Sequence, residues 1–397
     1  MLLVACGSSN GVAPPDAGGD VVTQQTSGQW VWESDVPATG TLKAIWAASA
    51  TDVWAGGDNG LMLHWNGSAW SKVDAATISH VSGIWGTSAN DVWATAGGIG
   101  GTNANNLVHW NGQAWSPVDP GTTINLASVW GTSPSDVYAV GASGVAGTVI
   151  HFDGATWSSL FDSGEMAPSG VAGSGASDVW VVGGNFSWAG NQFILHGASS
   201  GFSPVSSGVT QSLGSVFASS SNDAWAKGAA GLFHWNGTSW SPVPTTLGLG
   251  EGGVWGLGAD AVFAVGGAQQ IDAWNGSSWS TAHDDKIGAA LYAVGGSDAS
   301  HLWAVGDDAT IMRFDTSVTG TPSCADVHGT CGDASACSGH ASDYACGGAS
   351  TCCVAATACG GSEPSCCVNG SDPGPRAVCH NGAFYCPGGA SLCPLHP

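Results

Sequence analysis

One pattern of about 40 residues returns seven times along the chain, which is typical of a propeller or a solenoid. Its clearest copy, Ile84 to Val118, holds four short apolar runs separated by Gly, Asn, Ser or Asp. Four short strands per unit suit a propeller blade, so we predict an all-β fold, a seven-bladed β-propeller of four-stranded blades. The aromatic residues that mark the second run are Trp54, Trp93, Tyr138, Trp180, Trp225, Phe263 and Trp303.

An Asn-Gly pair separates the last two runs in several units, as at Asn111-Gly112. Because this pair tolerates positive φ, it is a strong signal for a two-residue hairpin. An aspartate precedes the second run in five units, where its carboxylate can accept backbone N–H groups in an Asx turn. These aspartates are Asp52, Asp91, Asp136, Asp178 and Asp223.

The seventh unit, residues 291–315, lacks its fourth run. An isolated run of the same kind, the sequence QWVW at 29–32, stands at the start of the repeat region. Pairing of this run with the last unit would remove exposed strand edges, which otherwise invite aggregation. We therefore predict that an N-terminal strand closes the last blade, with either Trp30 or Trp32 in the usual tryptophan position.

The repeats assign residues 29–318 to the propeller and leave other segments on both sides. Residues 1–6 end in the sequence LVAC, which resembles the lipobox of bacterial lipoproteins, so Cys6 is the predicted lipidation site after a remnant signal peptide. Residues 7–28 are rich in Gly, Pro, Ser and Asp and predict a flexible tether.

Residues 319–397 hold all but one of the 13 cysteines, and the propeller region holds none. An even number of cysteines in a short segment predicts a small disulfide-rich C-terminal module, whose pairing the sequence does not fix. Adjacent pairs such as Cys352-Cys353 lack the Cys-x-x-Cys spacing of zinc sites. An extracytoplasmic location follows, with the protein either lipid-anchored to the bacterial outer membrane or secreted. The predicted disulfide residues are Cys324, Cys331, Cys337, Cys346, Cys352, Cys353, Cys359, Cys366, Cys367, Cys379, Cys386 and Cys393.

The formal net charge is −23, with only six Lys plus Arg among 397 residues. Nucleic acids and anionic membranes both require a basic surface. We therefore expect no nucleic-acid partner and no membrane contact except through the lipid anchor. No motif supports a metal site or a cofactor, and the sequence leaves open a Ca²⁺ ion in the channel and the oligomeric state.

Tryptophans and histidines also recur at fixed positions of the repeat. We expect the tryptophans to wedge neighbouring blades together; stacking on sugar rings is the alternative. Besides the second-run aromatics, they form three columns: Trp46, Trp85, Trp130 and Trp255; Trp65, Trp110, Trp235 and Trp274; and Trp70, Trp115, Trp157, Trp240 and Trp279. We expect each histidine to hydrogen-bond a neighbouring loop or the repeat aspartate, as in WD-type blades. A metal ion bound jointly by these histidines is the less favoured alternative, because equivalent residues on separate blades lie too far apart to share one ion. These histidines are His64, His109, His151, His196 and His234.

Residues outside the repeat register are better functional candidates, because function usually lies in loops. The connection between the second and third strands is predicted to be long in blades 2, 3 and 4, at Ala96–Asn106, Gly141–Thr148 and Gly183–Gln192. The blade 4 loop carries a tryptophan flanked by amides, which suits a neutral glycan; a loop folded over the rim is the alternative. The candidate ligand-binding residues are Asn185, Phe186, Trp188, Asn191 and Gln192.

The unit Leu42 to Val73 resembles tectonin-type propeller repeats, with an Ile/Val strand, a Val-Trp strand and a closing Gly-x-x-Trp hairpin. It is similar, more distantly, to the Asp-box (BNR-like) hairpins of sialidases, although Trp65 and its equivalents replace the Asp-box acid. Tectonin-like proteins are often lectins for cell-surface glycans. The resemblance therefore implies glycan recognition through propeller loops.

Catalysis is the least favoured class. Sialidases clamp a carboxylate with several arginines, and the propeller region has only Arg313. Its glutamates, Glu33, Glu165 and Glu251, show no pairing of the kind that a glycosidase needs. We predict a non-catalytic, lectin-like binding protein on the bacterial surface. A scaffold or adhesin for protein partners is the alternative, and a glycosidase-type enzyme comes last.

Overall fold

The computed structural model describes residues 28–317, apart from 34, 78, 98–105, 145, 186–192, 210, 230, 246, 248–249, 251 and 285–289. Beyond this range it describes the backbone of short strands only, which are β29 (Gly329–Gly332), β30 (His340–Ser342), β31 (Thr351–Val354), β32 (Ser365–Val368), β33 (Asp372–Arg376), β34 (Val378–His380), β35 (Ala383–Tyr385) and β36 (Ser391–Leu392). Cys6, the predicted tether as far as residue 27 and the side chains of the C-terminal cysteines lie outside the described part, so the predictions made for them stay predictions.

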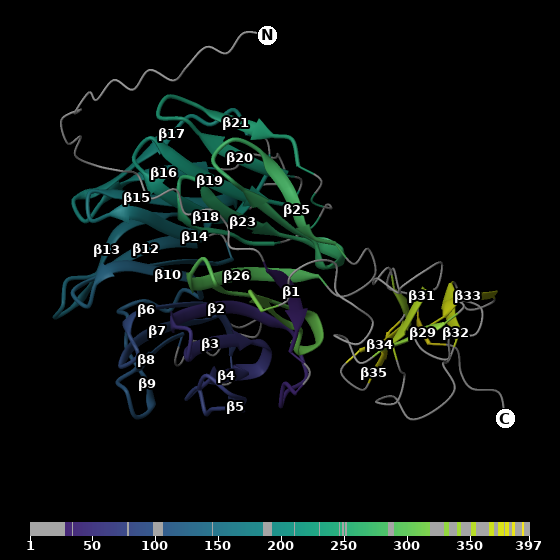
Figure 1. The fold of residues 1–397 in the computed structure, drawn as a ribbon. Coiled ribbons are helices and arrows are strands. Elements are labelled where there is room, and N and C mark those ends of the chain that lie inside the picture. Colours follow the sequence, from purple (N-terminus) through teal and green to yellow (C-terminus); the bar gives the residue numbers. More distant parts are fainter. Residues whose placement is uncertain are drawn as a thin grey trace, which may run out of the picture.

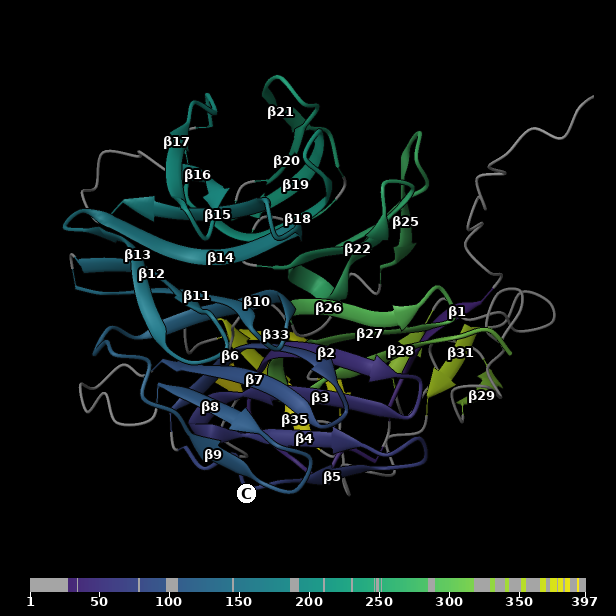
Figure 2. The same ribbon diagram turned by 90° about the vertical axis from the view of Figure 1, so that its left-hand side faces the viewer.

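Seven four-stranded antiparallel sheets follow one another as the blades of a propeller (Figure 1). Each innermost strand contacts the innermost strand of the next blade, and β26 returns to β2, so the ring closes. Figure 2 shows blades 1 and 2 with their strands in chain order from β2 to β5 and from β6 to β9. The seven-bladed all-β prediction is confirmed.

The strands of the first four blades have the following bounds. Blade 1 contains β2 (Leu42–Ser49), β3 (Asp52–Gly57), β4 (Met62–Trp65) and β5 (Trp70–Lys72). Blade 2 contains β6 (His80–Ser88), β7 (Asp91–Gly97), β8 (Leu107–Trp110) and β9 (Trp115–Pro117). Blade 3 contains β10 (Leu126–Ser133), β11 (Asp136–Ser143), β12 (Ala146–Phe152) and β13 (Trp157–Ser163). Blade 4 contains β14 (Met166–Gly175), β15 (Asp178–Asn185), β16 (Phe193–Ala198) and β17 (Gly201–Val205).

The remaining blades follow the same plan. Blade 5 contains β18 (Leu213–Ser220), β19 (Asp223–Gly228), β20 (Gly231–Trp235) and β21 (Trp240–Val243). Blade 6 contains β22 (Val254–Gly258), β23 (Ala261–Val265), β24 (Ile271–Trp274) and β25 (Trp279–His283). Blade 7 contains β26 (Leu291–Asp298), β27 (His301–Gly306), β28 (Ile311–Asp315) and β1 (Gln29–Trp32). Single 3₁₀ turns join the second and third strands of blades 1, 6 and 7: η1 (Asp58–Gly60), η2 (Gly267–Gln269) and η3 (Asp307–Ala309).

The N-terminal strand β1 completes blade 7, as predicted. Its pairing with β28 places Trp30 opposite Phe314. In blade 1, Trp70 lies opposite Trp65 in the same way, so Trp30 is the equivalent of Trp70. Trp30 is only 4% exposed and makes edge contacts with Phe314 and with Phe263 of blade 6. Trp30, and not Trp32, therefore occupies the usual tryptophan position.

Aromatic rings fill the interfaces between blades. Trp54 of blade 1 lies 4.9 Å from Trp110 and 5.2 Å from Trp115 of blade 2, measured between ring centroids. The interface between blades 4 and 5 repeats this arrangement with Trp180 against Trp235 and Trp240. Edge-to-face aromatic pairs stabilise a core beyond the area that they bury. This geometry agrees with the wedge interpretation of the tryptophan columns.

The long connection predicted for blade 3 is wrong. Strands β11 and β12 continue their pairing to Ser143 opposite Ala146, so a tight hairpin replaces the expected loop. Gly144 has a φ of +58°, a conformation that favours glycine, and therefore allows the sharp reversal. The extra residues of blade 3 lengthen the β11–β12 pairing because several of them, such as Thr148 and Val149, favour strands.

Candidate functional site

The predicted glycan-binding residues fall at the end of β15. Asn185 is the last residue of that strand. Phe186, Trp188, Asn191 and Gln192, like the side chain of Asn185, lie outside the described residues. The glycan site therefore stays a prediction.

The repeated histidines bind the repeated aspartates. In blade 5, Nε2 of His234 lies 2.6 Å from Oδ1 of Asp223, and the imidazole stacks on Trp225. The equivalent distances are 2.9 Å in blade 1, 2.6 Å in blade 2, 2.7 Å in blade 3 and 2.6 Å in blade 4. The histidine expected to bond the repeat aspartate does so in all five blades, and the pairs hold each second strand to its third.

The Asx-turn role expected for the aspartates is wrong. The carboxylate of Asp91 accepts hydrogen bonds from His109 and from the hydroxyl of Thr87, so its lone pairs face the blade. A serine shapes the preceding turn instead, since Oγ of Ser88 accepts the N–H of Asn90. The carboxylate is held inward because the half-buried imidazole needs a partner.

The pKa of Asp223 reflects this pairing. Burial by itself would raise the pKa of this carboxyl group. Hydrogen bonds from His234 and Ser219 and the charge of His234 outweigh burial, so the pKa lies below its ordinary value. Equivalent His–Asp pairs in five blades agree with the structural role that the sequence predicted for these histidines.

Six of the seven innermost strands carry a β-bulge at the same position. The pairing of β2 with β3, for example, passes from Leu42 opposite Gly57 to Ala44 opposite Gly56, and Lys43 is left out. A bulge re-aims the extra side chain and is frequent beside binding sites. The residues left out in this way are Lys43, Ser82, Ala127, Ser169, Gly214 and Tyr292.

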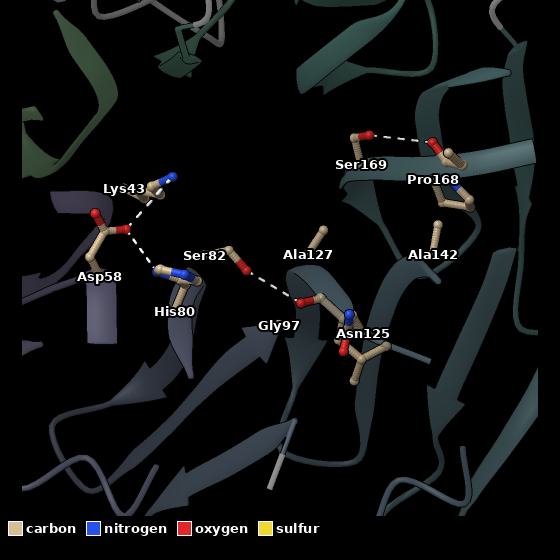
Figure 3. Close-up of a pocket in the computed structure, with 12 residues that line it drawn as sticks. Lys43, Asp58, His80, Ser82, Gly97, Asn125, Ala127, Ala142, Pro168 and Ser169 are labelled. Carbon is tan, nitrogen blue, oxygen red and sulfur yellow. Dashed lines mark hydrogen bonds and ion pairs between the residues drawn. The ribbon is translucent and has the colours of Figure 1, made fainter. Parts of the chain in front are cut away.

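Four of these bulge residues line a hollow of about 520 Å³ that spans blades 1 to 4. Three of them, Ser82, Ala127 and Ser169, are small, and this explains why the space stays open. Figure 3 shows Lys43 and His80 grouped with Asp58 at one end, and Pro168 and Ser169 at the other. We call this space the bulge hollow. The described residues that line it are Lys43, Asp58, His80, Ser82, Gly97, Asn125, Leu126, Ala127, Ala142, Ala167, Pro168 and Ser169.

The bulge hollow opens on the face where the second strands end. Gly97, the last residue of β7, belongs to its lining. The second-to-third strand connections of blades 2 and 4 leave from strand ends on this same face, because equivalent strands run in the same direction in every blade. The strand ends Gly97 and Asn185, after which the long loops were predicted, therefore lie on the same face of the propeller as the bulge hollow.

Charged groups gather at the blade 1 end of the hollow. Nδ1 of His80 lies 2.8 Å from Oδ1 of Asp58, and Nζ of Lys43 lies 3.7 Å from the same oxygen. Lys43 also sits 5.9 Å from the centroid of the Tyr292 ring, within the range of a cation–π contact. The side chains of Lys43 and His80 are 41% and 33% exposed and line the hollow, although Nδ1 of His80 is buried against Asp58.

The other described cations have different surroundings. Lys227 is buried and donates from Nζ to the carbonyl oxygens of Gly228 and Gly250, and burial lowers its pKa. Arg313 takes the histidine position in blade 7 and pairs with Glu33 at 2.7 Å and Asp315 at 3.0 Å. Lys72 lies on the outermost strand of blade 1. Among the described cations, only Lys43 lines the bulge hollow.

The described residues contain no group of three or more His, Cys, Asp and Glu side chains arranged to hold a metal ion. They also contain no helix with the length and apolar character that a membrane crossing requires.

Comparison with known proteins gives a likeness of fold. No family model matches the chain, and no curated protein matches it in sequence. Similar solved structures include YCF48 bound to a D1 peptide, at 16% identity and a TM-score of 0.56, covering 72% of this chain and 96% of that one. The WD40 β-propeller domain of Doa1 matches at 11% identity and 0.56, covering 73% and 97%. Streptogramin B lyase matches at 12% and 0.57, covering 72% and 97%. At these identities the likeness shows the propeller fold alone.

The bulge residues were not among the site residues predicted from the sequence. A signal was present, because each lies two positions before the buried Ile or Val of an innermost strand, such as Ile45 or Val129. When the repeats are aligned on this Ile or Val, Lys43 of blade 1 occupies the position that Ser82, Ala127, Ser169 and Gly214 occupy in blades 2 to 5. The alignment of aromatic residues alone concealed this contrast.

Proposed function

We propose that this protein is a non-catalytic binding protein that holds an extended segment of a protein partner in the bulge hollow. One observation carries the proposal: small side chains at successive bulges leave an open, elongated space across four blades on the face of the long loops. Its volume of about 520 Å³ falls in the range of ordinary ligand sites, about 300–1,000 Å³.

The lining of the hollow favours a peptide. It combines hydroxyl and amide groups from Ser82, Ser169 and Asn125 with the apolar surface of alanines and Pro168. Such a mixture can bind both the backbone and small side chains of an extended chain. None of the described residues that line the hollow is a tryptophan on which a sugar ring could stack. Among proteins of similar fold, YCF48 is known with a D1 peptide bound, which agrees with a peptide ligand.

Glycan binding is the competing proposal. It rests on Trp188 and its amide neighbours, which follow β15 of blade 4 in the sequence. A glycan ligand would therefore be expected to depend on Trp188 and to tolerate changes inside the bulge hollow. The two proposals predict opposite mutational patterns.

The localisation belongs to the proposal as well. Lipidation at Cys6, or secretion, would place the propeller outside the cytoplasm, where a Cys-rich module is oxidised. The propeller would then face partners in the cell envelope. Globomycin treatment tests the anchor: accumulation of an unprocessed form would support it, and an unchanged form would remove it.

Parallel arrays test the binding proposal. The full chain, oxidised, is applied to an array of synthetic 12-residue peptides and to a glycan array, beside a Ser169→Trp variant that fills the hollow. A Ser116→Trp variant, altered on the exposed outermost strand of blade 2, is the matched control. We expect peptide binding that Ser169→Trp abolishes and Ser116→Trp leaves intact. Glycan binding that survives Ser169→Trp and is lost in Trp188→Ala would overturn the proposal.

A further inference from the structure

We propose that the blade 1 end of the bulge hollow is a carboxylate-binding subsite, in which Lys43 and His80 receive an acidic group of the bound peptide. This inference rests on the proposed function and names a chemical requirement of the ligand. The carboxylate would come from an Asp or Glu side chain or from a free chain end.

The first support is the availability of the Lys43 donors. Its Nζ lies 3.7 Å from Asp58, which is longer than a hydrogen bond, so this contact occupies none of its three N–H donors. The Tyr292 ring lies beside the ammonium group and steadies it without using a donor either. Lys43 is therefore held in place and still able to bind an anion.

The second support is the way in which one carboxylate is shared. Asp58 Oδ1 contacts His80 at 2.8 Å, and the same oxygen is the nearest acidic group to Lys43. Among the described residues that line the hollow, Asp58 is the only acidic one. A second carboxylate at this end would face the Lys43 ammonium group, and it would also face Nε2 of His80, which donates when the imidazole is protonated.

The third support is the contrast with the rest of the molecule. The chain carries a net charge of −23, and its other described cations are buried, ion-paired or on an outer strand. A bulge places Lys43 in the lining of the bulge hollow, whereas the bulges of blades 2 to 4 carry small residues. Charge complementarity at such a point mainly selects the ligand and its register.

The sign of one substitution separates a binding role from a structural role. If Asp58 competes with the ligand for Lys43 and His80, Asp58→Asn should tighten the binding of acidic peptides. If Asp58 only maintains the fold of this corner, the same change should weaken binding of every peptide. Lys43→Gln removes the charge, and Lys43→Arg restores it.

The experiment uses the full chain and an array of 12-residue peptides in three forms. The first form contains Asp and Glu and has an amidated C-terminus. In the second and third forms Asn and Gln replace Asp and Glu, and the C-terminus is amidated in the second form and a free carboxylate in the third. Wild type is expected to bind an acidic form about tenfold more tightly than its neutral partner. Lys43→Gln should remove this preference, Lys43→Arg should retain it, and Asp58→Asn should increase it severalfold. Lys72→Gln, a change on outer strand β5, is the matched control and should behave as wild type.

Each outcome is decisive. A preference for the acidic side chain or for the free end identifies the source of the carboxylate. Binding that Ser169→Trp blocks, with equal affinity for acidic and neutral peptides, would overturn the subsite and leave the proposed function standing. Absence of binding to every form would overturn both. Thermal unfolding of each variant separates a loss of binding from a loss of fold.

Discussion

Nε2 of His234 lies 2.6 Å from Oδ1 of Asp223. The imidazole is stacked on Trp225 with 4.1 Å between ring centroids, and Trp225 in turn contacts Trp274 and Trp279 of the next blade. One ion pair thus connects the start of a second strand to the interface between two blades. The same connection recurs in blades 1 to 5, so these pairs contribute to the stability of most of the ring.

The His234→Phe variant tests this connection. Phenylalanine keeps the ring stack and removes both nitrogens, which leaves the Asp223 carboxylate without its main partner. A buried polar group that loses its partner costs about 1–3 kcal/mol, so the free energy of unfolding should fall by that amount in urea titrations. His301→Phe is the control, because His301 and Asp298 form a pair with 44% and 55% exposed side chains. An equal loss in both variants would contradict the account.

The pH dependence of stability follows from the lowered pKa of Asp223. A carboxyl group whose pKa is lowered by folding stabilises the protein above its unfolded pKa of about 3.9. This contribution disappears as the pH falls through the lower folded pKa. Wild type should therefore lose more stability than Asp223→Asn between about pH 5 and pH 2. Parallel unfolding curves for the two proteins over this interval would refute the prediction.

Closure of the ring depends on Trp30. Trp30 is 4% exposed, whereas Trp32 is only partly buried. Replacing a buried tryptophan by alanine costs about 3–5 kcal/mol, so Trp30→Ala should lower the free energy of unfolding by that amount. Trp32→Ala is the matched variant on the same strand and should cost clearly less. A larger loss of stability in Trp32→Ala than in Trp30→Ala would contradict the assignment of Trp30 to the interface between blades.

Tyr138 provides a spectroscopic check on the buried aromatic column. Burial, followed by the negative charge of Asp136, raises the pKa of Tyr138 to about 12. Ultraviolet titration should therefore show one of the four tyrosines ionising near pH 12, and Tyr138→Phe should remove that step. A pKa raised by folding stabilises the protein below the unfolded value of about 10, and this stability is lost as the pH rises toward the folded pKa. Ionisation of all tyrosines together near pH 10 in folded protein would contradict the burial.

The repeat made most of the fold predictable from the sequence. Period, turn residues and the missing fourth run of the last unit were enough to predict seven blades and a closing strand. The choice between Trp30 and Trp32 required the strand register, since both lie at nearly the same distance from the next unit. The length of the blade 3 connection was mispredicted because Gly144 allows a hairpin inside a segment that otherwise resembles a loop.

The candidate site was harder to predict than the fold. Lys43 and Ser82 are ordinary polar residues in strand positions, and the bulges leave both out of the strand pairing beside the bulge hollow. Sequence patterns record the alternation of a regular strand and give no direct sign of one inserted residue. Asp58 and His80 belong to different blades, so their contact depends on the packing of β6 against η1.

Site-specific photocrosslinking tests the central claim most directly. Benzoylphenylalanine is placed at Ala127 in the bulge hollow and, in a separate protein, at Ser116 on the exposed strand β9. Both full-length proteins are irradiated in the cells that make them, and the adducts are identified by mass spectrometry. We expect polypeptide adducts at Ala127 that Lys43→Gln or Ser169→Trp diminishes, and none above background at Ser116. Adducts at Ser116 alone, or no polypeptide adduct at Ala127, would contradict binding in the hollow.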